Sequence, residues 1–270
     1  MFADDLKLYS SINISEYSFS LQQSLDNLTE WSNHWQLAIN VEKCAVLSIG
    51  KNANSNLYRI NNVVLKNVDN MHDLGIDVDS NLFFHKHINC IVTKARQRLG
   101  VLYRGFVTRN PNFMRKSYIT YIRPLLEYNS VVWNPYQVKY KNLIERVQRN
   151  FTRWIPALHD LPYSERLALL NLETLECRRL KFDLTLYYKI FHGLVAIDSA
   201  NHFNYYSAIL SPRNTSPKLI KPVKGTTNYF NCFFNRSIDC YNSLPHNVKH
   251  CTSLLLFKKN LLTPLILLHI

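Results

Sequence analysis

The sequence predicts an α+β fold, in which short strands and one helix precede a mainly helical region. Three observations support this class. Apolar residues recur at helical spacing over several long windows, short apolar runs bounded by turn residues occupy much of residues 1–79, and six Gly in 270 residues are too few for a turn-rich sandwich. We expect a strand-bearing domain over 1–79, a helical domain over 80–200, and a C-terminal segment over 201–270 whose fold the sequence does not define.

The first domain opens with the acidic pair Asp4-Asp5 between short apolar runs, as in a tight hairpin. A helix of about 20 residues should begin near Ser15, because large apolar side chains recur every three or four residues. They are Tyr17, Leu21, Leu25, Leu28, Trp31 and Trp35. Three strand-forming stretches follow: 43–49, a hairpin over 57–65 that turns at Asn61-Asn62, and 72–78.

After residue 79 the pattern becomes helical. The expected buried faces are Ile88, Ile91, Ala95, Leu99 and Leu102; then Met114, Tyr118, Tyr121 and Ile122; then Leu143, Ile144, Val147, Phe151 and Ile155. Pro124 should end or bend the second helix and Pro156 should stop the third. A fourth helix is expected over 175–192, with Gly193 as its stop, and a short one near 252–263.

Positive charge is concentrated in one block. The chain carries 32 Lys+Arg against 19 Asp+Glu, and residues 80–126 hold nine basic residues and no acidic one. A continuous basic block after an acidic start favours a polyanionic partner, nucleic acid above all. The alternative is general basicity that keeps the protein in solution.

Several classes of site are excluded or disfavoured. Neither GxGxxG nor GxxxxGK[ST] occurs, so a Gly-rich phosphate loop is not expected. The six Cys lack zinc-ligand spacing. Scattered Cys without a signal peptide indicate an intracellular protein, of nucleus or cytoplasm, and no apolar run has the length of a membrane span. The apolar tail 261–270 should be a buried helix or strand end.

Two adjacent carboxylates on a tight turn could ligate a divalent metal, since hard cations prefer oxygen ligands. Two-metal nucleotidyl transfer holds its ions about 3.5–4 Å apart with such groups. An isolated Asp-Asp pair is otherwise a solvated turn, so the surrounding sequence has to decide between the two.

Strings spread along nearly the whole chain resemble the reverse transcriptases of non-LTR, jockey-type retrotransposons, in the order that the family shows. The first is FADD, which resembles the [YF]ADD box. The others are LQQSLDNLTEWSNHWQLAINVEKC (21–44), DLGIDVDSNLFFHKHI (73–88), KARQRLGVLYRGF (94–106), YIRPLLEYNSVVWNP (121–135), IERVQRNFTRWI (144–155), YSERLALLNLETLECRRLKFDL (163–184), FFNRSIDCYNSLP (233–245) and FKKNL (257–261).

The resemblance implies a partial palm over 1–79 and a helical thumb-like domain over 80–200. Asp4 and Asp5 would be the catalytic metal ligands, for Mg2+ or Mn2+, with Asp4 the principal one. Gly75 would lie in the primer-grip turn, where a small residue lets backbone approach the primer. The implied partners are an RNA template, a DNA primer and, in an intact enzyme, a dNTP, with no membrane.

The basic residues suit such a thumb. Arg146, Arg149 and Arg153 recur on one side of their helix, and Lys94, Arg98 and Arg104 flank the apolar face of another. Their alternative is an ordinary solvated face. Aromatic residues that could stack on bases are more simply core residues at helical spacing: Tyr118, Tyr121, Tyr128 and Trp133.

The sequence starts one residue before FADD, so the fingers, the upstream palm and its further Asp are expected to be missing. One hairpin cannot by itself hold two Mg2+ ions. Three hypotheses remain open: a polymerase fragment that is active only in a longer chain, a nucleic-acid-binding thumb without chemistry, and a functionless remnant of an element.

Overall fold

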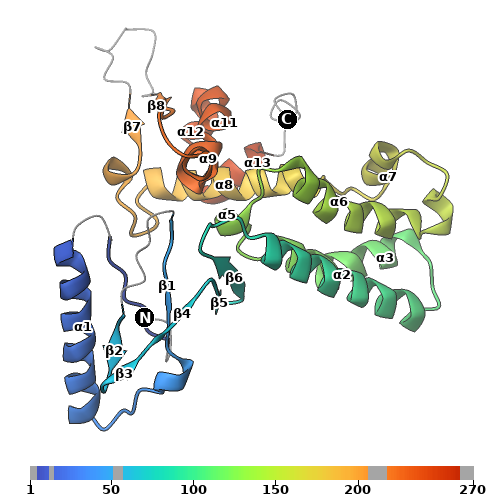
Figure 1. Ribbon diagram of the computed structural model, residues 1–270. Coiled ribbons are helices and arrows are strands. Elements are labelled where there is room, and N and C mark those ends of the chain that lie inside the picture. Colours follow the sequence, from blue (N-terminus) through green and yellow to red (C-terminus); the bar gives the residue numbers. More distant parts are fainter. Residues whose placement is uncertain (1–4, 12–14, 51–56, 206–217, 262–270) are drawn as a thin grey trace, which may run out of the picture. The chain divides into compact units, whose positions relative to one another are not determined.

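The computed structural model describes the chain except residues 1–4, 12–14, 51–56, 206–217 and 262–270. The chain divides into two compact units, Met1–His87 and Ile88–Ile270. Helices and small two-stranded sheets both occur (Figure 1), so the predicted α+β class is confirmed. Within the described residues, no helix combines the length and the apolar composition needed to cross a bilayer.

The first unit holds one long helix and three strand pairs. Its elements are α1 (Ser15–His34), a 3-10 turn η1 (Val41–Lys43), β1 (Ala45–Leu47), β2 (Arg59–Ile60), β3 (Val63–Val64), β4 (Lys66–Val68), β5 (Asn70–Asp73) and β6 (Ile76–Asp79). β2–β3 and β5–β6 pair antiparallel, whereas β1 and β4 pair parallel with Ala45 opposite Lys66. The predicted helix near Ser15 and the strand within 43–49 are therefore confirmed.

A small core joins α1 to β2 and the residues that follow it. Leu25 is buried with Tyr58, Ile60 and Leu65. The Gln22 side chain adds two polar contacts, because its amide donates to the Arg59 carbonyl (3.0 Å) and accepts from the Arg59 N–H (2.9 Å). An amide side chain thus satisfies backbone groups of β2 that a neighbouring strand would otherwise satisfy.

The expected apolar stripe of α1 is buried only in part. Leu25 is buried, but Trp31 and Trp35 are 51% and 61% exposed. Helical spacing alone located the helix correctly, yet it overstated how much of the stripe packs against the described residues of this unit.

Two turns with left-handed backbone shape the strand pairs. Asn61 (φ 51°) and Asn62 (φ 66°) connect β2 to β3, which confirms the predicted hairpin. Leu74 (φ 44°) and Gly75 (φ 86°) connect β5 to β6 in the same way. The expectation of a single strand over 72–78 was therefore wrong, because the chain reverses in the middle of that stretch.

The first half of the second unit is helical. Its elements are α2 (His85–Gly105, which begins in the last residues of the first unit), α3 (Pro111–Ser117), a π-helical turn η2 (Tyr118–Ile122), α4 (Arg123–Glu127), α5 (Ser130–Trp133), α6 (Val138–Arg153), a 3-10 turn η3 (Pro156–Leu158), α7 (Tyr163–Leu169) and α8 (Leu175–Phe191). The helices predicted on apolar periodicity at 88–102, 143–155 and 175–192 are confirmed.

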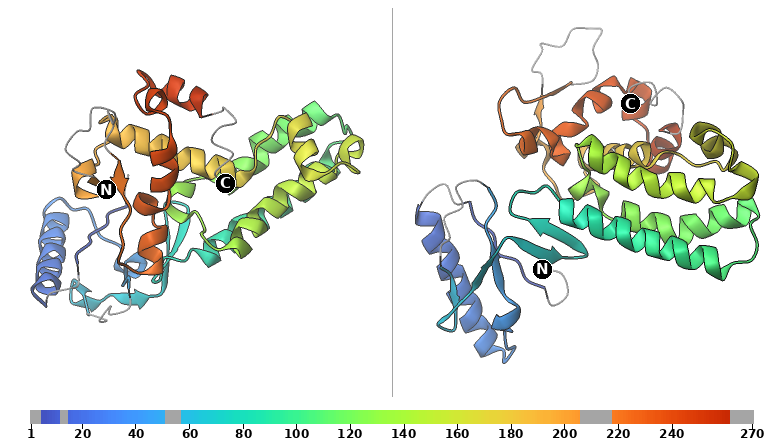
Figure 2. Two further views of the ribbon diagram at one scale, coloured as in Figure 1. Left: turned by 90° about the horizontal axis from the view of Figure 1, so that it is seen from above. Right: turned by 45° about the vertical axis from the view of Figure 1, so that its right-hand side comes forward.

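The helices α2, α3 and α6 lie alongside one another in each view (Figures 1 and 2). The rings of Tyr118 and Phe151 stack with their centres 4.4 Å apart between α6 and the turn after α3. That turn winds wide, so that the Arg123 N–H donates to the Tyr118 carbonyl five residues earlier. Pro124, which has no N–H, follows directly in the first turn of α4, so it does not end the helix, and that it bends the helix stays a prediction.

Helix α8 ends as predicted at Gly193. The Gly193 N–H donates to the Ile190 carbonyl (3.1 Å) and the Leu194 N–H to the Lys189 carbonyl (2.8 Å). With Gly193 at φ 65°, this is the Schellman arrangement that satisfies the last carbonyls of a helix.

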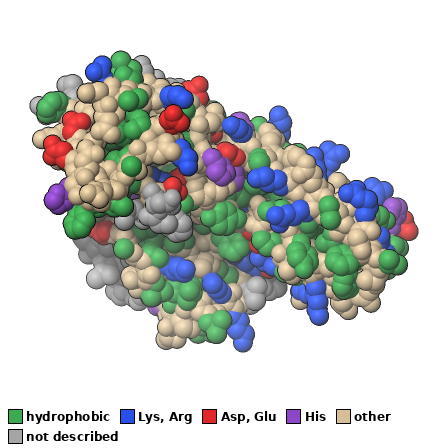
Figure 3. Space-filling model, turned by 90° about the horizontal axis from the view of Figure 1, so that it is seen from below, with side chains coloured by type: hydrophobic (Ala, Val, Ile, Leu, Met, Phe, Trp, Pro, Cys, Tyr) green, Lys and Arg blue, Asp and Glu red, His purple; other side chains and the backbone are tan. Residues whose placement is uncertain are grey.

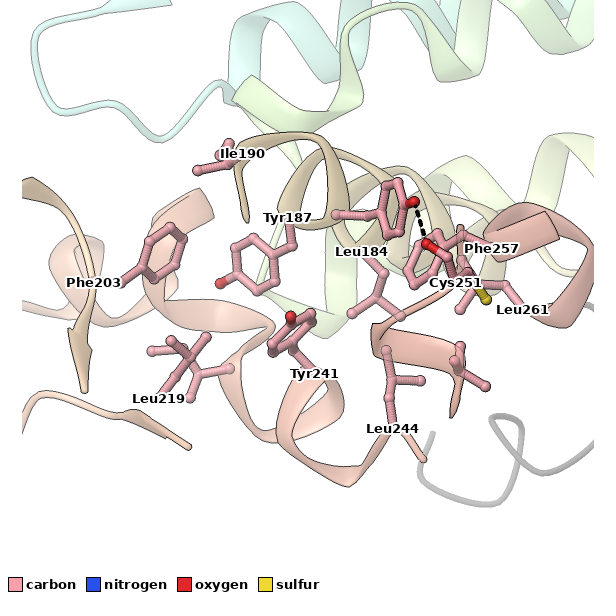
Figure 4. Close-up of a cluster of buried hydrophobic side chains, with 13 residues drawn as sticks. Leu184, Tyr187, Ile190, Phe203, Leu219, Tyr241, Leu244, Cys251, Phe257 and Leu261 are labelled. Carbon is pink, nitrogen blue, oxygen red and sulfur yellow. Dashed lines mark hydrogen bonds between the residues drawn. The ribbon is translucent and has the colours of Figure 1, made fainter. Parts of the chain in front are cut away.

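The C-terminal segment packs on α8. It contains η4 (Ser199–Asn201), β7 (Asn204–Tyr205), β8 (Leu219–Ile220), α9 (Thr227–Asn231), α10 (Phe233–Arg236), α11 (Ile238–Ser243), α12 (His246–Lys249) and α13 (Leu254–Asn260). Figure 4 shows Leu184 and Tyr187 of α8 facing residues of this segment, among them Phe203, Tyr241 and Phe257. The Tyr188 hydroxyl donates to the Cys251 carbonyl at 2.7 Å. The predicted short helix near 252–263 is confirmed as α13, whereas the tail 262–270 lies outside the described residues.

Candidate nucleic-acid interface

The acidic pair is described only in part. Asp4 lies outside the described residues, and Asp5 is exposed. No group of three or more His, Cys, Asp or Glu that could hold a metal ion occurs among the residues that the structure describes. Carboxylate oxygens suit Mg2+, but one exposed carboxylate does not make a two-ion site. The metal centre that the sequence suggests, with Asp4 as its principal ligand, therefore stays a prediction.

The segment that contains Asp5 lies beside the β5–β6 hairpin. Lys7 Nζ is 2.5 Å from Asp73 Oδ1, and Asp73 is the last residue of β5, two residues before Gly75. Asp5 and Gly75, which are 70 positions apart in the sequence, thus belong to neighbouring segments of the first unit. Gly75 is exposed at the tip of the turn, where its backbone is accessible.

A further set of polar contacts fixes the base of this hairpin. Burial opposes the charged form of Asp77, but hydrogen bonding to His72 (Nδ1 to Oδ1, 3.0 Å) and the charges of His72, His87 and Lys86 outweigh it, so the pKa of Asp77 is lowered. The carboxylates of Asp73 and Asp77 are therefore both paired with basic groups, which leaves neither as a free metal ligand.

Helix α6 presents an arginine row to solvent. Arg146, Arg149 and Arg153 are exposed, whereas Ile144, Val147 and Phe151 are fully buried. At about 100° per residue, the three arginines fall within one narrow sector opposite the buried side. The helical spacing of these three residues in the sequence therefore agrees with their common exposed face in the structure.

Two residues that the sequence did not indicate, Tyr163 and Arg166, lie beside the row, although Arg166 itself is buried. The guanidinium of Arg149 lies 5.1 Å from the centre of the Tyr163 ring, and that of Arg166 lies 5.5 Å from the same ring. Arg166 Nη1 also donates to the Arg149 carbonyl at 3.2 Å. Burial, together with Arg153 and Arg149, lowers the pKa of Arg166. Tyr163 and Arg166 belong to α7, so their position beside the row depends on a contact between two helices and cannot be read from the sequence.

Next to the arginine row, α6 carries a buried polar network that orients the helix. Gln148 accepts from the Tyr118 hydroxyl (2.9 Å) and donates to the Tyr163 hydroxyl (3.0 Å). Glu145 accepts from the Tyr163 hydroxyl and from the Leu175 N–H (2.9 Å) at the start of α8. Burial raises the pKa of Glu145. These bonds leave α6 little freedom to rotate, so the arginine row has a fixed direction.

The basic residues of α2 are exposed but less aligned. Lys94 and Arg98 are one helical turn apart beside the buried stripe, and Arg98 Nη1 lies 3.4 Å from the Tyr121 carbonyl. Arg104 lies roughly opposite the buried stripe, and its guanidinium folds back over Gly100. The three residues therefore do not form a single row.

Several other cations of the second unit form ion pairs with carboxylates. Arg178 pairs with Glu127, Lys181 with Glu173 and Lys141 with Glu176. Among the described residues, no carboxylate pairs with any of the six predicted basic residues. They are Lys94, Arg98, Arg104, Arg146, Arg149 and Arg153. On the face shown in Figure 3, Lys and Arg side chains are spread over the helical part of this unit and outnumber the acidic ones.

The aromatic residues considered for stacking divide into two groups. Tyr118 and Trp133 are buried, as core residues at helical spacing should be, whereas Tyr121 and Tyr128 are exposed. The core prediction is therefore confirmed for the first two and wrong for the other two.

Comparison with known proteins connects the chain to mobile-element enzymes. It is 28% identical over 188 residues to a probable RNA-directed DNA polymerase from transposon BS of Drosophila melanogaster, covering 65% of this chain and 20% of the polymerase. It is 31% identical over 105 residues to the RNA-directed DNA polymerase from mobile element jockey of Drosophila funebris, covering 36% of this chain and 11% of the polymerase.

A third relative is an uncharacterized protein of Caenorhabditis elegans, 29% identical over 151 residues, which are 55% of this chain and 75% of that protein. No protein-family profile and no solved structure matches the chain. The chain is thus similar to a part, a fifth or less, of each of the two polymerases.

Proposed function

We propose that this chain is part of the RNA-directed DNA polymerase of a non-LTR retrotransposon, and that its helical residues 80–200 act as a thumb that holds the template–primer duplex. Residues 1–79 correspond in this proposal to part of the palm, with Asp4 and Asp5 as metal ligands and Gly75 at the primer grip. The similarity to the BS and jockey polymerases supports the family relation. Activity belongs to a longer polymerase chain and is not proposed for these residues alone.

The observation that carries the proposal is the arginine row of α6. Arg146, Arg149 and Arg153 point to solvent from a helix whose rotation is fixed by the buried contacts of Gln148 and Glu145. Successive guanidinium groups along one helix face can contact successive phosphates of a backbone, and such contacts set position without reading sequence. Lys94, Arg98 and Arg104 on α2 would extend the contacts beyond the row.

Salt-dependent binding tests this proposal. The purified chain should bind an RNA–DNA duplex, and the logarithm of its affinity should fall linearly with the logarithm of salt concentration between about 50 and 200 mM. Arg146→Ala, Arg149→Ala and Arg153→Ala should each reduce the slope by about one, because each removes about one phosphate contact.

Lys141→Ala is the matched control, since it removes a cation from the same helix. Lys141 Nζ already pairs with Glu176 at 2.6 Å, so its loss should leave the slope unchanged. Equal slopes in the three arginine variants and in the wild-type chain would refute the proposed interface, as would a wild-type chain that does not bind the duplex at low salt.

A further inference from the structure

A cavity of about 450 Å³ lies where α2 and α6 end, and we call it the tip cavity. It is lined by Tyr103, Arg153, Trp154, Pro156, His159 and Asp160. Tyr103 belongs to the last turn of α2, and Trp154 is the residue that closes α6. Two helix ends that are about 50 residues apart in sequence thus bring two aromatic rings to one site.

The two rings are held in place but not covered. Their centres are 5.1 Å apart with the planes inclined by 54°, and Tyr103 and Trp154 are 39% and 38% exposed. The Trp154 N–H bonds to the carbonyls of Asn150 and Phe151, which fixes the backbone that carries its ring. Large aromatic surface at a fixed, half-exposed position is the arrangement that stacking on a base requires.

Arg109 also holds Tyr103 in place. Its guanidinium carbon lies 4.2 Å from the centre of the Tyr103 ring, and its Nη2 donates to the Tyr103 carbonyl at 2.7 Å. Arg109 therefore holds the ring and also satisfies a carbonyl at the end of α2. The orientation of Tyr103 is set before any ligand arrives.

The charges at the tip cavity favour a base inside and phosphates outside. Both helices end here, so the negative ends of their dipoles disfavour an anion deep in the cavity. Asp160 and His159, whose side chains pair at 2.9 Å, add a carboxylate to the lining. Arg153 lines the same cavity and is also the last member of the arginine row. A phosphate backbone bound along the row would therefore reach the edge of the cavity.

We propose that the tip cavity binds one unpaired nucleobase of a single-stranded stretch next to the duplex, in contact with the rings of Tyr103 and Trp154. The inference rests on the proposed function, because it adds a base-binding subsite to the same helical unit. A duplex alone cannot fill this subsite, since its bases are already stacked on one another.

Three ligands test the subsite: a blunt RNA–DNA duplex, the same duplex with an unpaired overhang, and that overhang with abasic positions. The wild-type chain should bind the base-bearing overhang about fivefold or more tighter than the blunt duplex, and the abasic overhang should bring no such gain. Tyr103→Ala and Trp154→Ala should lose the gain while they bind blunt duplex as the wild-type chain does.

Trp154→Phe keeps a ring at the site and should retain most of the gain, which separates stacking from a loss of fold. A gain that survives Trp154→Ala, or that abasic positions also give, would overturn the inference. Binding of single strands with bases and of abasic single strands, without any duplex, tests the subsite independently of duplex binding. If the chain fails to bind blunt duplex but still prefers the base-bearing strand, the proposed function is refuted and this inference stands.

Discussion

Asp183 accepts two hydrogen bonds from the guanidinium of Arg236, 2.8 Å from Nε and 2.7 Å from Nη2, although 53 residues separate the two in sequence. Asp183 is 1% exposed and also accepts from the Ser237 hydroxyl at 3.2 Å. Arg236 Nη2 further donates to the Val131 carbonyl at 2.6 Å. One buried ion pair therefore ties α8, α5 and the C-terminal helices together.

Removal of one partner of this pair should destabilise the second unit strongly. Asp183→Ala leaves the Arg236 guanidinium buried without its counter-charge, and the loss should be about 3–5 kcal/mol in the free energy of unfolding. Chemical denaturation measures it. The control is Asp239→Ala, which breaks the exposed pair with Lys221 (2.6 Å) and should cost about 1 kcal/mol or less. Equal losses in the two variants would contradict the role of the buried pair.

The Leu74-Gly75 turn predicts opposite effects of two substitutions. Leu74 has φ 44°, which a branched side chain adopts at a cost, so Leu74→Asn should raise the stability of the first unit. Gly75 has φ 86°, and Gly75→Ala should lower stability by about 1 kcal/mol or more. Gly105→Ala, at a helix end with open space around it, is the control and should not destabilise. Thermal unfolding gives all three values, and a stabilising Gly75→Ala would show that this turn geometry is wrong.

His250 predicts acid sensitivity of the C-terminal helices. Burial, together with the charges of His246, His192 and Lys249, lowers the pKa of His250 below its ordinary value of 6.5. The unfolded chain therefore takes up the proton at a higher pH than the folded one, so stability should fall as pH drops below about 6.5 and through the folded pKa.

Unfolding midpoints measured over a pH series should show this fall, and His250→Gln should reduce it. An unchanged profile in His250→Gln would assign the acid sensitivity to other groups.

Primer extension should fail with this chain. Two-metal nucleotidyl transfer needs several carboxylates around the same ions, and one Asp-Asp hairpin does not supply them by itself. We expect no dNTP incorporation on a primed RNA template with Mg2+ or Mn2+, and Asp5→Asn should leave duplex affinity unchanged. Processive extension that Asp5→Asn abolishes would show instead that the chain holds a complete metal centre.

The sequence predicted helices best where one face is wholly buried. In α2 and α6 every apolar position at helical spacing contributes to the core or its edge, and the predicted limits were close. The local pattern failed at 72–78, because Leu74 is a residue type that rarely takes the positive φ of a turn. The chain nevertheless reverses there, and Asn70–Asp73 pairs with Ile76–Asp79. It could not predict the parallel pairing of β1 with β4, since no local signal encodes which strands meet.

The candidate interface was predictable only within single helices. Helical spacing gave Arg146, Arg149 and Arg153, whose common direction is a property of α6 alone. Arg166 comes to Arg149 through packing of α7 on α6, and Trp154 comes to Tyr103 through the meeting of two helix ends. Such neighbours depend on tertiary structure, and a linear pattern carries no information about them.

The aromatic side of α8 limits how the polypeptide can be shortened. Tyr187 and Tyr188 are covered by residues of the C-terminal segment, among them Tyr241 and Phe257. A polypeptide that stopped near residue 200 would expose these rings to water as a large hydrophobic patch. Such a truncated product should aggregate or recruit chaperones, so a nucleic-acid-binding assay on the helical domain should also include the C-terminal segment 201–270.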